Sequence, residues 1–140
     1  MIIIACLDDN NGMLFNNRRL SMDQVLRKHI LQITANRKLY MNNYSYGQFS
    51  DEADGNIIVD DNLLNNAQKG DYCFIENYLL SNHINKIEKI IIYRWNRIYP
   101  SDMKFDVSLD NNWSIISKYD FKGNSHNKIT EEVYARNEKE

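Results

Sequence analysis

Long apolar runs predict the buried strands of a sheet. Met1–Leu7 is apolar throughout and contains three consecutive isoleucines, which is typical of a strand covered on both faces. Lys89–Trp95 (KIIIYRW) is a second strongly apolar run, and Tyr72–Ile75 is a third. Lys38–Met41 and Asn56–Val59 are shorter strand candidates. We expect Met1–Leu7 to lie in the centre of the sheet.

Helical spacing of apolar residues recurs between these strands. It predicts a helix over Met22–Thr34, capped by Ser21 at its N-terminus. The preceding segment, Asp8–Asn17, gathers Asp, Asn and Gly without periodicity, so we expect a long loop. The arginines that follow it, Arg18 and Arg19, are interpreted as solvated loop charges.

Two shorter helices are expected in the middle of the chain. The first runs to Ala67, with Asp60 or Asp61 as its cap and Gly70 closing it. The second covers about Tyr78–Ile84 and would bury its two leucines and its isoleucine. Strand and helix thus alternate through the first 95 residues, an order that implies parallel strands with helices on both faces of the sheet.

The last part of the chain contains strand patterns only. Trp113–Asp120 and Lys128–Ala135 flank KGNSHN, which has the Gly and Asn of a connecting turn, so an antiparallel hairpin should lie at the sheet edge. The fold class is therefore α/β, with a mostly parallel central sheet flanked by helices and a C-terminal antiparallel hairpin. We expect one domain over residues 1–136, followed by a charged tail (NEKE, residues 137–140) that frays.

Charge and composition exclude several classes of function. The formal net charge is −2 and the isoelectric point is about 5.9, so general attraction to a phosphate backbone is not expected to drive binding. No apolar run is long enough to span a bilayer, and we expect a cytoplasmic protein. Cys6 and Cys73 lie in apolar runs and should be free buried thiols. The three histidines are far apart, so no metal site is assigned.

Several segments resemble the dihydrofolate reductase family, whose fold is shared with the reductase domain of riboflavin biosynthesis. KIEKIIIYRW, followed by Asp102, Phe105 and Trp113, resembles the family's late strand, its Asp-Thr-x-Phe segment and the next Trp. Near the start, IIIACLDDNNGM and then FNN resemble its first strand and Gly-containing active-site loop. The resemblance implies this fold over nearly the whole chain, with NADPH as the cofactor of an active member.

The positions that match the family's cofactor site differ from its pattern. Where the family has a glycine triplet at which a cis peptide lets backbone approach the pyrophosphate, this chain has Ile75, Glu76 and Asn77. Side chains would fill that approach, Glu76 would repel phosphate, and a cis bond before it would cost about 2.5 to 4 kcal/mol. We therefore expect dinucleotide binding to be strongly disfavoured.

The second phosphate anchor also departs from the family. Its Gly-Arg-x-Thr matches a segment that begins with Asn42 and Asn43 and ends with Ser45, so only Ser45 retains a hydroxyl for phosphate. The family's arginine for the folate tail falls near Asp54, which reverses the charge, and the segment after Val59 is too short to hold adenosine. This chain therefore has residues that match the family's cofactor-binding positions, but we expect these residues not to bind a cofactor.

Asp23 is the candidate for a catalytic residue. It matches the carboxylate that holds the pterin ring in the family and assists its protonation, although the match needs an internal gap. The alternative, which we favour, is that Asp23 only stabilises the positive end of the helix dipole, worth about 0.3 to 1 kcal/mol.

Aromatic residues beside arginines mark a candidate binding surface formed by Arg94, Trp95, Arg97 and Tyr99. Such a group can stack bases or hold a protein partner. Ordinary solvated arginines at a strand end are the favoured alternative, because the net charge is negative and the cluster is short.

Three hypotheses of function follow. The leading one is a degenerate, noncatalytic protein of this fold that binds a protein or a small ligand through the former active-site face, without a cofactor. The second is a divergent NADPH-dependent reductase of dihydrofolate or a related pterin or pyrimidine, with Asp23 as proton donor or orienter. The third is a nucleic-acid-binding accessory protein, and a homodimer also stays open.

Overall fold

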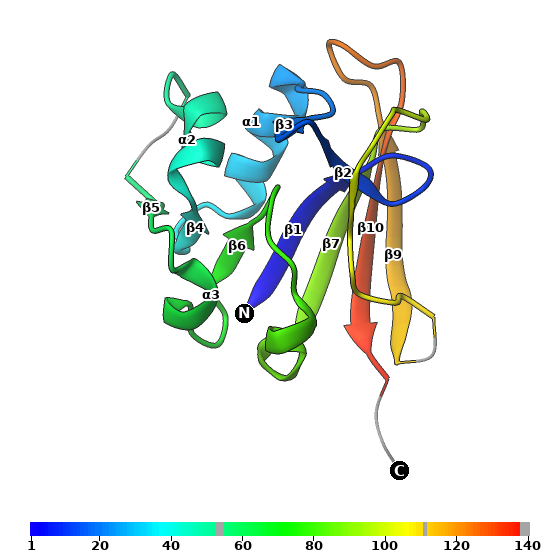
Figure 1. Ribbon diagram of the computed structural model, residues 1–140. Helices are drawn as coiled ribbons and strands as arrows, with labels where there is room; N and C mark the ends of the chain where they lie inside the picture. Colours follow the sequence, from blue (N-terminus) through cyan, green and yellow to red (C-terminus); the bar gives the residue numbers. More distant parts are fainter. Residues whose placement is uncertain (53–54, 111, 138–140) are drawn as a thin grey trace.

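A computed structural model, which describes residues 1–52, 55–110 and 112–137, contains one large sheet, one small sheet and short helices (Figure 1). The large sheet has the strand order β5-β4-β6-β1-β7-β10-β9, and the small one has the order β3-β2-β8. The strands are β1 Ile2–Leu7, β2 Gly12–Phe15, β3 Arg18–Arg19, β4 Leu39–Met41, β5 Ile57–Val59, β6 Tyr72–Phe74, β7 Lys89–Arg94, β8 Met103–Lys104, β9 Trp113–Phe121 and β10 Ile129–Arg136. The helices are α1 Gln24–Ile33, α2 Asn43–Phe49, α3 Leu63–Asn66 and the 3₁₀ helix Ser81–Lys86.

Strand β1 lies inside the large sheet, as its apolar sequence predicts. It pairs in parallel with β6 on one side and with β7 on the other. Ile3, Ile4 and Leu7 are fully buried, because side chains on both faces of a central strand point into core. The expected mostly parallel α/β architecture is confirmed.

Each face of the large sheet carries its own hydrophobic core. On one face, α1 and α2 pack over alternate residues of the strands, with Leu26, Ile30 and Phe49 in contact with Ile4 and Phe74. The opposite face is covered by α3, the 3₁₀ helix and the segment around Phe105 (Figure 1). The sheet is therefore the middle of three layers.

The N-terminus of α1 is capped by Asp23, so the predicted cap at Ser21 was wrong. Asp23 has extended backbone angles (φ −152°, ψ 125°), and its carboxylate accepts a hydrogen bond from the amide of Leu26. This is the usual geometry of an N-cap. Carboxylate capping thus moves the helix start to Gln24.

Residues 8–17 are not the continuous loop that was predicted. Strands β2 and β3 form a hairpin through Asn16 and Asn17, whose φ angles are +51° and +62°. A two-residue turn with two positive φ angles matches the twist of a hairpin, and Asn tolerates this conformation well. Strand β8, which was not predicted either, pairs with the other side of β2.

Three further helical details differ from the prediction. Helix α2 was not expected. The cap of α3 is Asn62 rather than an aspartate, although Asp60 accepts hydrogen bonds from the amide of Asn62 and the side chain of Asn66. The helix predicted at Tyr78–Ile84 is instead the 3₁₀ helix, which leaves Leu79 58% exposed while Leu80 is fully buried.

The C-terminal hairpin is confirmed. Strands β9 and β10 are antiparallel, with Ile129 opposite Phe121, and β10 joins them to β7 at the sheet edge. Of the predicted charged tail, residues 138–140 lie outside the described residues. Within the part of the chain that the structure describes, no helix is long and apolar enough to cross a bilayer.

Candidate functional site

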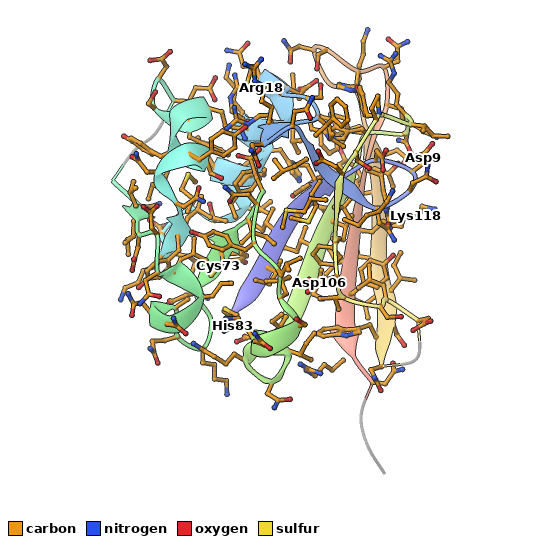
Figure 2. All side chains as sticks on the ribbon, in the orientation of Figure 1. Asp9, Arg18, Cys73, His83, Asp106 and Lys118 are labelled. Carbon is orange, nitrogen blue, oxygen red and sulfur yellow. The ribbon has the colours of Figure 1, made fainter. Side chains whose placement is uncertain are left out.

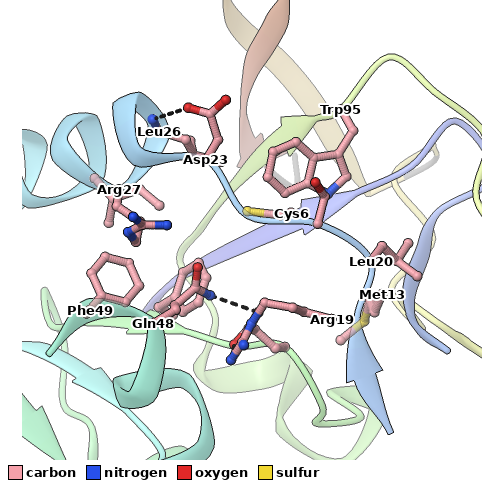
Figure 3. Close-up of a pocket in the computed structure, with 14 residues that line it drawn as sticks. Cys6, Met13, Arg19, Leu20, Asp23, Leu26, Arg27, Gln48, Phe49 and Trp95 are labelled. Atoms are coloured by element: carbon pink, nitrogen blue, oxygen red, sulfur yellow. Dashed lines mark hydrogen bonds and ion pairs between the residues drawn. The ribbon is translucent and has the colours of Figure 1, made fainter. Parts of the chain in front are cut away.

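A closed pocket lies between α1 and α2 beyond the carboxyl ends of β1 and β6 (Figure 3). Ligands commonly bind at this edge of parallel sheets. Leu26, Ile30, Phe49, Phe74 and Trp95 form an apolar wall, and polar side chains close the opening. The remaining cavity volume is about 10 Å³, roughly what one water molecule needs.

Glu76 is the centre of the polar cluster that closes this pocket. The side chain is 7% exposed. Its carboxylate accepts hydrogen bonds from Nε and Nη2 of Arg19 at 2.9 and 3.1 Å. It also accepts from Oγ of Ser45 at 2.8 Å and from Nε2 of Gln48 at 2.9 Å. The charge of Arg19 and the hydrogen bonds from Ser45 and Gln48 stabilise the buried carboxylate at the opening of the pocket.

Arg19 reaches the cluster from β3, where it lies opposite the buried Leu14. It also donates through Nη2 to the carbonyl of Tyr44, and its guanidinium lies 4.3 Å from the Tyr44 ring centroid. Burial alone would lower the pKa of Arg19, but hydrogen bonding and attraction to Glu76 outweigh it, so the pKa is raised. The interpretation of Arg19 as a solvated loop charge was wrong, because the hairpin turns it inward. Arg18 is exposed, as expected.

The matched cofactor positions Asn42, Asn43, Ser45 and Asn77 surround this cluster. Asn42 caps α2 by accepting from the amide of Ser45, and its side-chain amide donates to Asn77 at 2.8 Å. The amide of Asn43 donates to Asp61. Two backbone amides at the start of α2, those of Asn43 and Ser45, are thus bonded within the protein itself.

The backbone around Ile75 continues the pairing of the central strands. The peptide bonds of the described residues are all trans. Ile75 is 1% exposed and donates its amide to the carbonyl of Ile4, continuing the pairing of β6 with β1. Ile75 is thus part of the core, and Glu76 follows it at the polar cluster that closes the pocket. Asp54, which matches the position of the family's arginine for the folate tail, lies outside the described residues.

Asp23 lines the opposite side of the pocket and is 2% exposed (Figure 3). Besides capping α1, it accepts from the amide and hydroxyl of Ser125 at 2.8 and 2.9 Å. Burial opposes its ionisation, but the hydrogen bonds from the Ser125 and Leu26 amides outweigh burial, so the pKa of Asp23 is lowered. The hydrogen bonds therefore favour the ionised carboxylate, which ties the hairpin loop to α1.

A hydrogen-bonded chain continues from Asp23 towards the surface. Ser125 Oγ lies 2.8 Å from Nδ1 of His126, and Nε2 of His126 lies 2.8 Å from the hydroxyl of Tyr99. His126 also stacks on Trp95 with ring centroids 4.5 Å apart. Burial lowers the pKa of His126, attraction to Asp23 opposes this, and Arg97 adds to the lowering. The imidazole is thus held neutral near neutral pH.

The structure separates the four residues of the candidate binding surface. Trp95 is 3% exposed and belongs to the core. Arg94 donates to Glu132 at 2.9 Å and to the carbonyl of Asp8. Arg97 is exposed and lies over the ring of Tyr99, 5.5 Å from its centroid. Only Arg97 and part of Tyr99 are available to a partner.

Cysteine chemistry and metal binding have little support in this site. Cys6 and Cys73 are free thiols, as predicted, but only Cys73 is buried, whereas Cys6 is half-buried. Burial is the main cause that raises the pKa of each, to about 12 for Cys73, so neither is an activated nucleophile. Among the described residues, no group of three His, Cys, Asp or Glu side chains could hold a metal ion.

Sequence reasoning did not find Arg19, Gln48, Ser125 and His126 as members of the site. Gln48 lies on α2, which was not predicted, and Arg19 lies on the unpredicted hairpin. Ser125 and His126 belong to the connecting turn KGNSHN, where polar residues were assigned to turn formation. No local pattern connects them with Asp23, which is about a hundred residues away in sequence.

Comparisons with known proteins identify a fold. No family model and no curated protein matches the sequence. The structure is similar to that of dihydrofolate reductase from Enterococcus faecalis complexed with NADP(H) and RAB-propyl. The TM-score is 0.70 at 12% sequence identity, over 98% of this chain and 96% of that chain. The chain therefore has a dihydrofolate reductase-like fold.

Proposed function

We propose that this chain is a noncatalytic protein with a dihydrofolate reductase-like fold, which binds a ligand through the face where reductases of this fold hold substrate and cofactor. The observation that carries the proposal is the hydrogen bonding of Glu76. Its carboxylate lies where the family resemblance puts bare glycine backbone, and it is held by Arg19, Ser45 and Gln48.

Repulsion between a phosphate and the Glu76 carboxylate is the reason why this proposal excludes dinucleotide binding. A phosphate at the start of α2 would meet the Glu76 carboxylate while Ser45 already donates to that carboxylate. Like charges at close range in a partly buried site repel strongly. Moving Glu76 away would leave Arg19 and Ser45 without their main partner, so the cost would include several broken hydrogen bonds. No cofactor is part of the proposed function.

The competing function is a divergent NADPH-dependent reductase, favoured by one observation: Asp23 is a buried carboxylate that lines the pocket. Against it stands the saturation of that carboxylate by Leu26 and Ser125, which lowers its pKa. An acid catalyst needs a pKa close to the working pH.

The third function, nucleic-acid binding, loses support because Trp95 is buried and Arg94 is paired.

Calorimetric titration of the purified chain with NADPH, together with turnover of dihydrofolate, tests the proposal. We expect neither saturable heat nor oxidation of NADPH above the rate without protein. Saturable NADPH binding, or turnover that Asp23→Asn abolishes, would overturn it. Thermal unfolding of the Asp23→Asn variant, measured in parallel, separates loss of turnover from loss of folding.

A further inference from the structure

An open hollow lies on the outer side of β3, next to the closed pocket. It has a volume of about 490 Å³ and is lined by Phe15, Asn16, Arg18, Arg19, Leu20, Tyr99 and Pro100. Arg19 and Leu20 line both this hollow and the closed pocket, so β3 is the wall between them. The volume is in the range of small-molecule sites, about 300 to 1,000 Å³.

The β2–β3 hairpin presents an aromatic ring and a cation to this hollow as a pair. Phe15 lies directly opposite Arg18 in the pairing, and Leu14 lies opposite Arg19. Opposed residues of antiparallel strands share a face, and successive residues alternate. Since Leu14 is buried and Arg19 points to Glu76, Phe15 and Arg18 face outward. Phe15 is 42% exposed, and Figure 2 shows Arg18 at the same end of the molecule as the hairpin.

Hydrogen bonds hold both walls of the hollow, one at Tyr99 and the other at the hairpin turn. The backbone amide of Tyr99 donates to the buried carboxylate of Asp8 at 3.0 Å, and its hydroxyl bonds to His126. The hairpin turn is anchored by the amide of Asn16, which donates to Asp102 at 3.0 Å. Both walls are thus fixed before any ligand arrives, which reduces the entropic cost of binding.

Charge indicates the kind of ligand. Arg19, Arg27 and Arg94 each pair with a glutamate. Arg18, by contrast, has no carboxylate partner among the described residues, and Arg97 lies nearby over the Tyr99 ring. Two carboxylates bond to the walls of the hollow, and each accepts a backbone amide: Asp102 accepts from Asn16 and the buried Asp8 accepts from Tyr99. Arg18, the lining arginine without a carboxylate partner among the described residues, favours an anion. The exposed ring of Phe15 and the half-buried ring of Tyr99 favour a flat aromatic group.

We propose that this hollow binds a small aromatic anion, with the ring between Phe15 and Tyr99 and the anionic group on Arg18. The inference rests on the proposed function for the general location of the ligand face and adds the ligand class and the residues. Guanidinium groups bind planar anions in a bidentate manner, so Arg18 sets the charge preference while the rings supply contact area.

A fluorescent aromatic sulfonate, anilinonaphthalene sulfonate, is a suitable probe, with the uncharged phenylnaphthylamine as its matched analogue. We expect the wild-type chain to bind the sulfonate more tightly than the neutral compound. Arg18→Gln should weaken sulfonate binding about tenfold while changing neutral binding little, and Phe15→Ser should weaken both. Arg37→Gln, which changes an exposed arginine beyond the other end of α1, should leave both unchanged.

Amide chemical shifts in NMR spectra locate the probe. The proposal predicts shifts at Phe15, Arg18 and Tyr99. Shifts confined to Leu26, Ile30 and Phe49 would place the probe in the closed pocket and overturn the proposal, as would equal affinity of Arg18→Gln for the sulfonate. An NADPH titration of the same samples reports separately on the proposed function, because binding of NADPH would contradict that function without changing the shifts in the hollow.

Discussion

The side chain of Glu76 accepts four hydrogen bonds although it is 7% exposed. Its donors come from β3 and α2, so one carboxylate joins two elements to the end of β6. The presence of a glutamate at position 76 explains both why the pocket is closed and why Arg19 points inward. A residue of this type at this position could be recognised in the sequence, but its partners could not, since they lie 28 to 57 residues away.

Glu76→Gln removes the charge and keeps the shape. We expect a loss of about 2 kcal/mol in the free energy of unfolding, because Arg19 is left partly buried without its carboxylate. Urea denaturation measures this loss. Glu52→Gln is the matched control, because it breaks the Arg27 ion pair, which lacks the additional donors, and should cost less than about 1 kcal/mol. Equal losses in the two variants would contradict the role assigned to Glu76.

Substitution of two glycines by alanine provides a second test at the level of single residues. A Cβ at Gly123 would contact the Asp23 carboxylate and approach Cδ1 of Ile129 to 2.8 Å. Gly123→Ala should therefore destabilise the protein by about 1 to 3 kcal/mol. At Gly47, inside α2, an added Cβ would meet nothing within 4 Å, so Gly47→Ala should stabilise by about 0.5 to 1 kcal/mol. Thermal unfolding of both variants is the measurement, and a stable Gly123→Ala protein would be evidence against close docking of this loop on Asp23.

Among the elements, those with long apolar runs follow from the sequence and the short ones do not. Strands β1 and β7 are predicted because uninterrupted apolar runs have few alternatives to a buried strand. Helix α2 (NYSYGQF) has weak helix formers and only seven residues, so its stability comes from the Asn42 cap and the packing of Phe49. The β2–β3 hairpin depends on an Asn-Asn turn and on pairing with β8, which is distant in sequence.

The loop between β9 and β10 is an element whose stability should depend on pH. It is held by Ser125 and His126 against Asp23, Trp95 and Tyr99. Because burial lowers the pKa of His126 in the folded state, the unfolded chain binds a proton more readily. Stability is then complete above the ordinary histidine pKa of about 6.5 and decreases as the pH falls below it.

Urea denaturation between pH 8 and pH 5 measures this dependence. His126→Gln should have a flatter profile than the wild-type protein over that range. The lowered pKa values of Asp8, Asp23 and Glu131 contribute stability that is present at these pH values and is lost only under more acidic conditions. Identical profiles for wild type and His126→Gln would show that the imidazole is not responsible.

For the whole molecule, the fold is similar to that of a dihydrofolate reductase, with a TM-score of 0.70 at only 12% sequence identity. The alternation of strands and helices and the final hairpin made this architecture predictable, because connections between parallel strands follow few routes. The candidate site was predictable only as a set of departures from the family pattern. The hydrogen bonds that Arg19, Ser45 and Gln48 donate to Glu76 could not be predicted, because they depend on the three-dimensional arrangement of β3, α2 and β6.

The central claim is that the Glu76 cluster fills the position of a dinucleotide phosphate. An NMR titration with NADPH, following the amides of Ser45, Glu76 and Asn77, tests it at those residues. The account predicts that these amides keep their positions throughout the titration. Saturable shifts at the three amides, with the protein remaining folded, would contradict it and show that the chain binds a dinucleotide at this edge of the sheet.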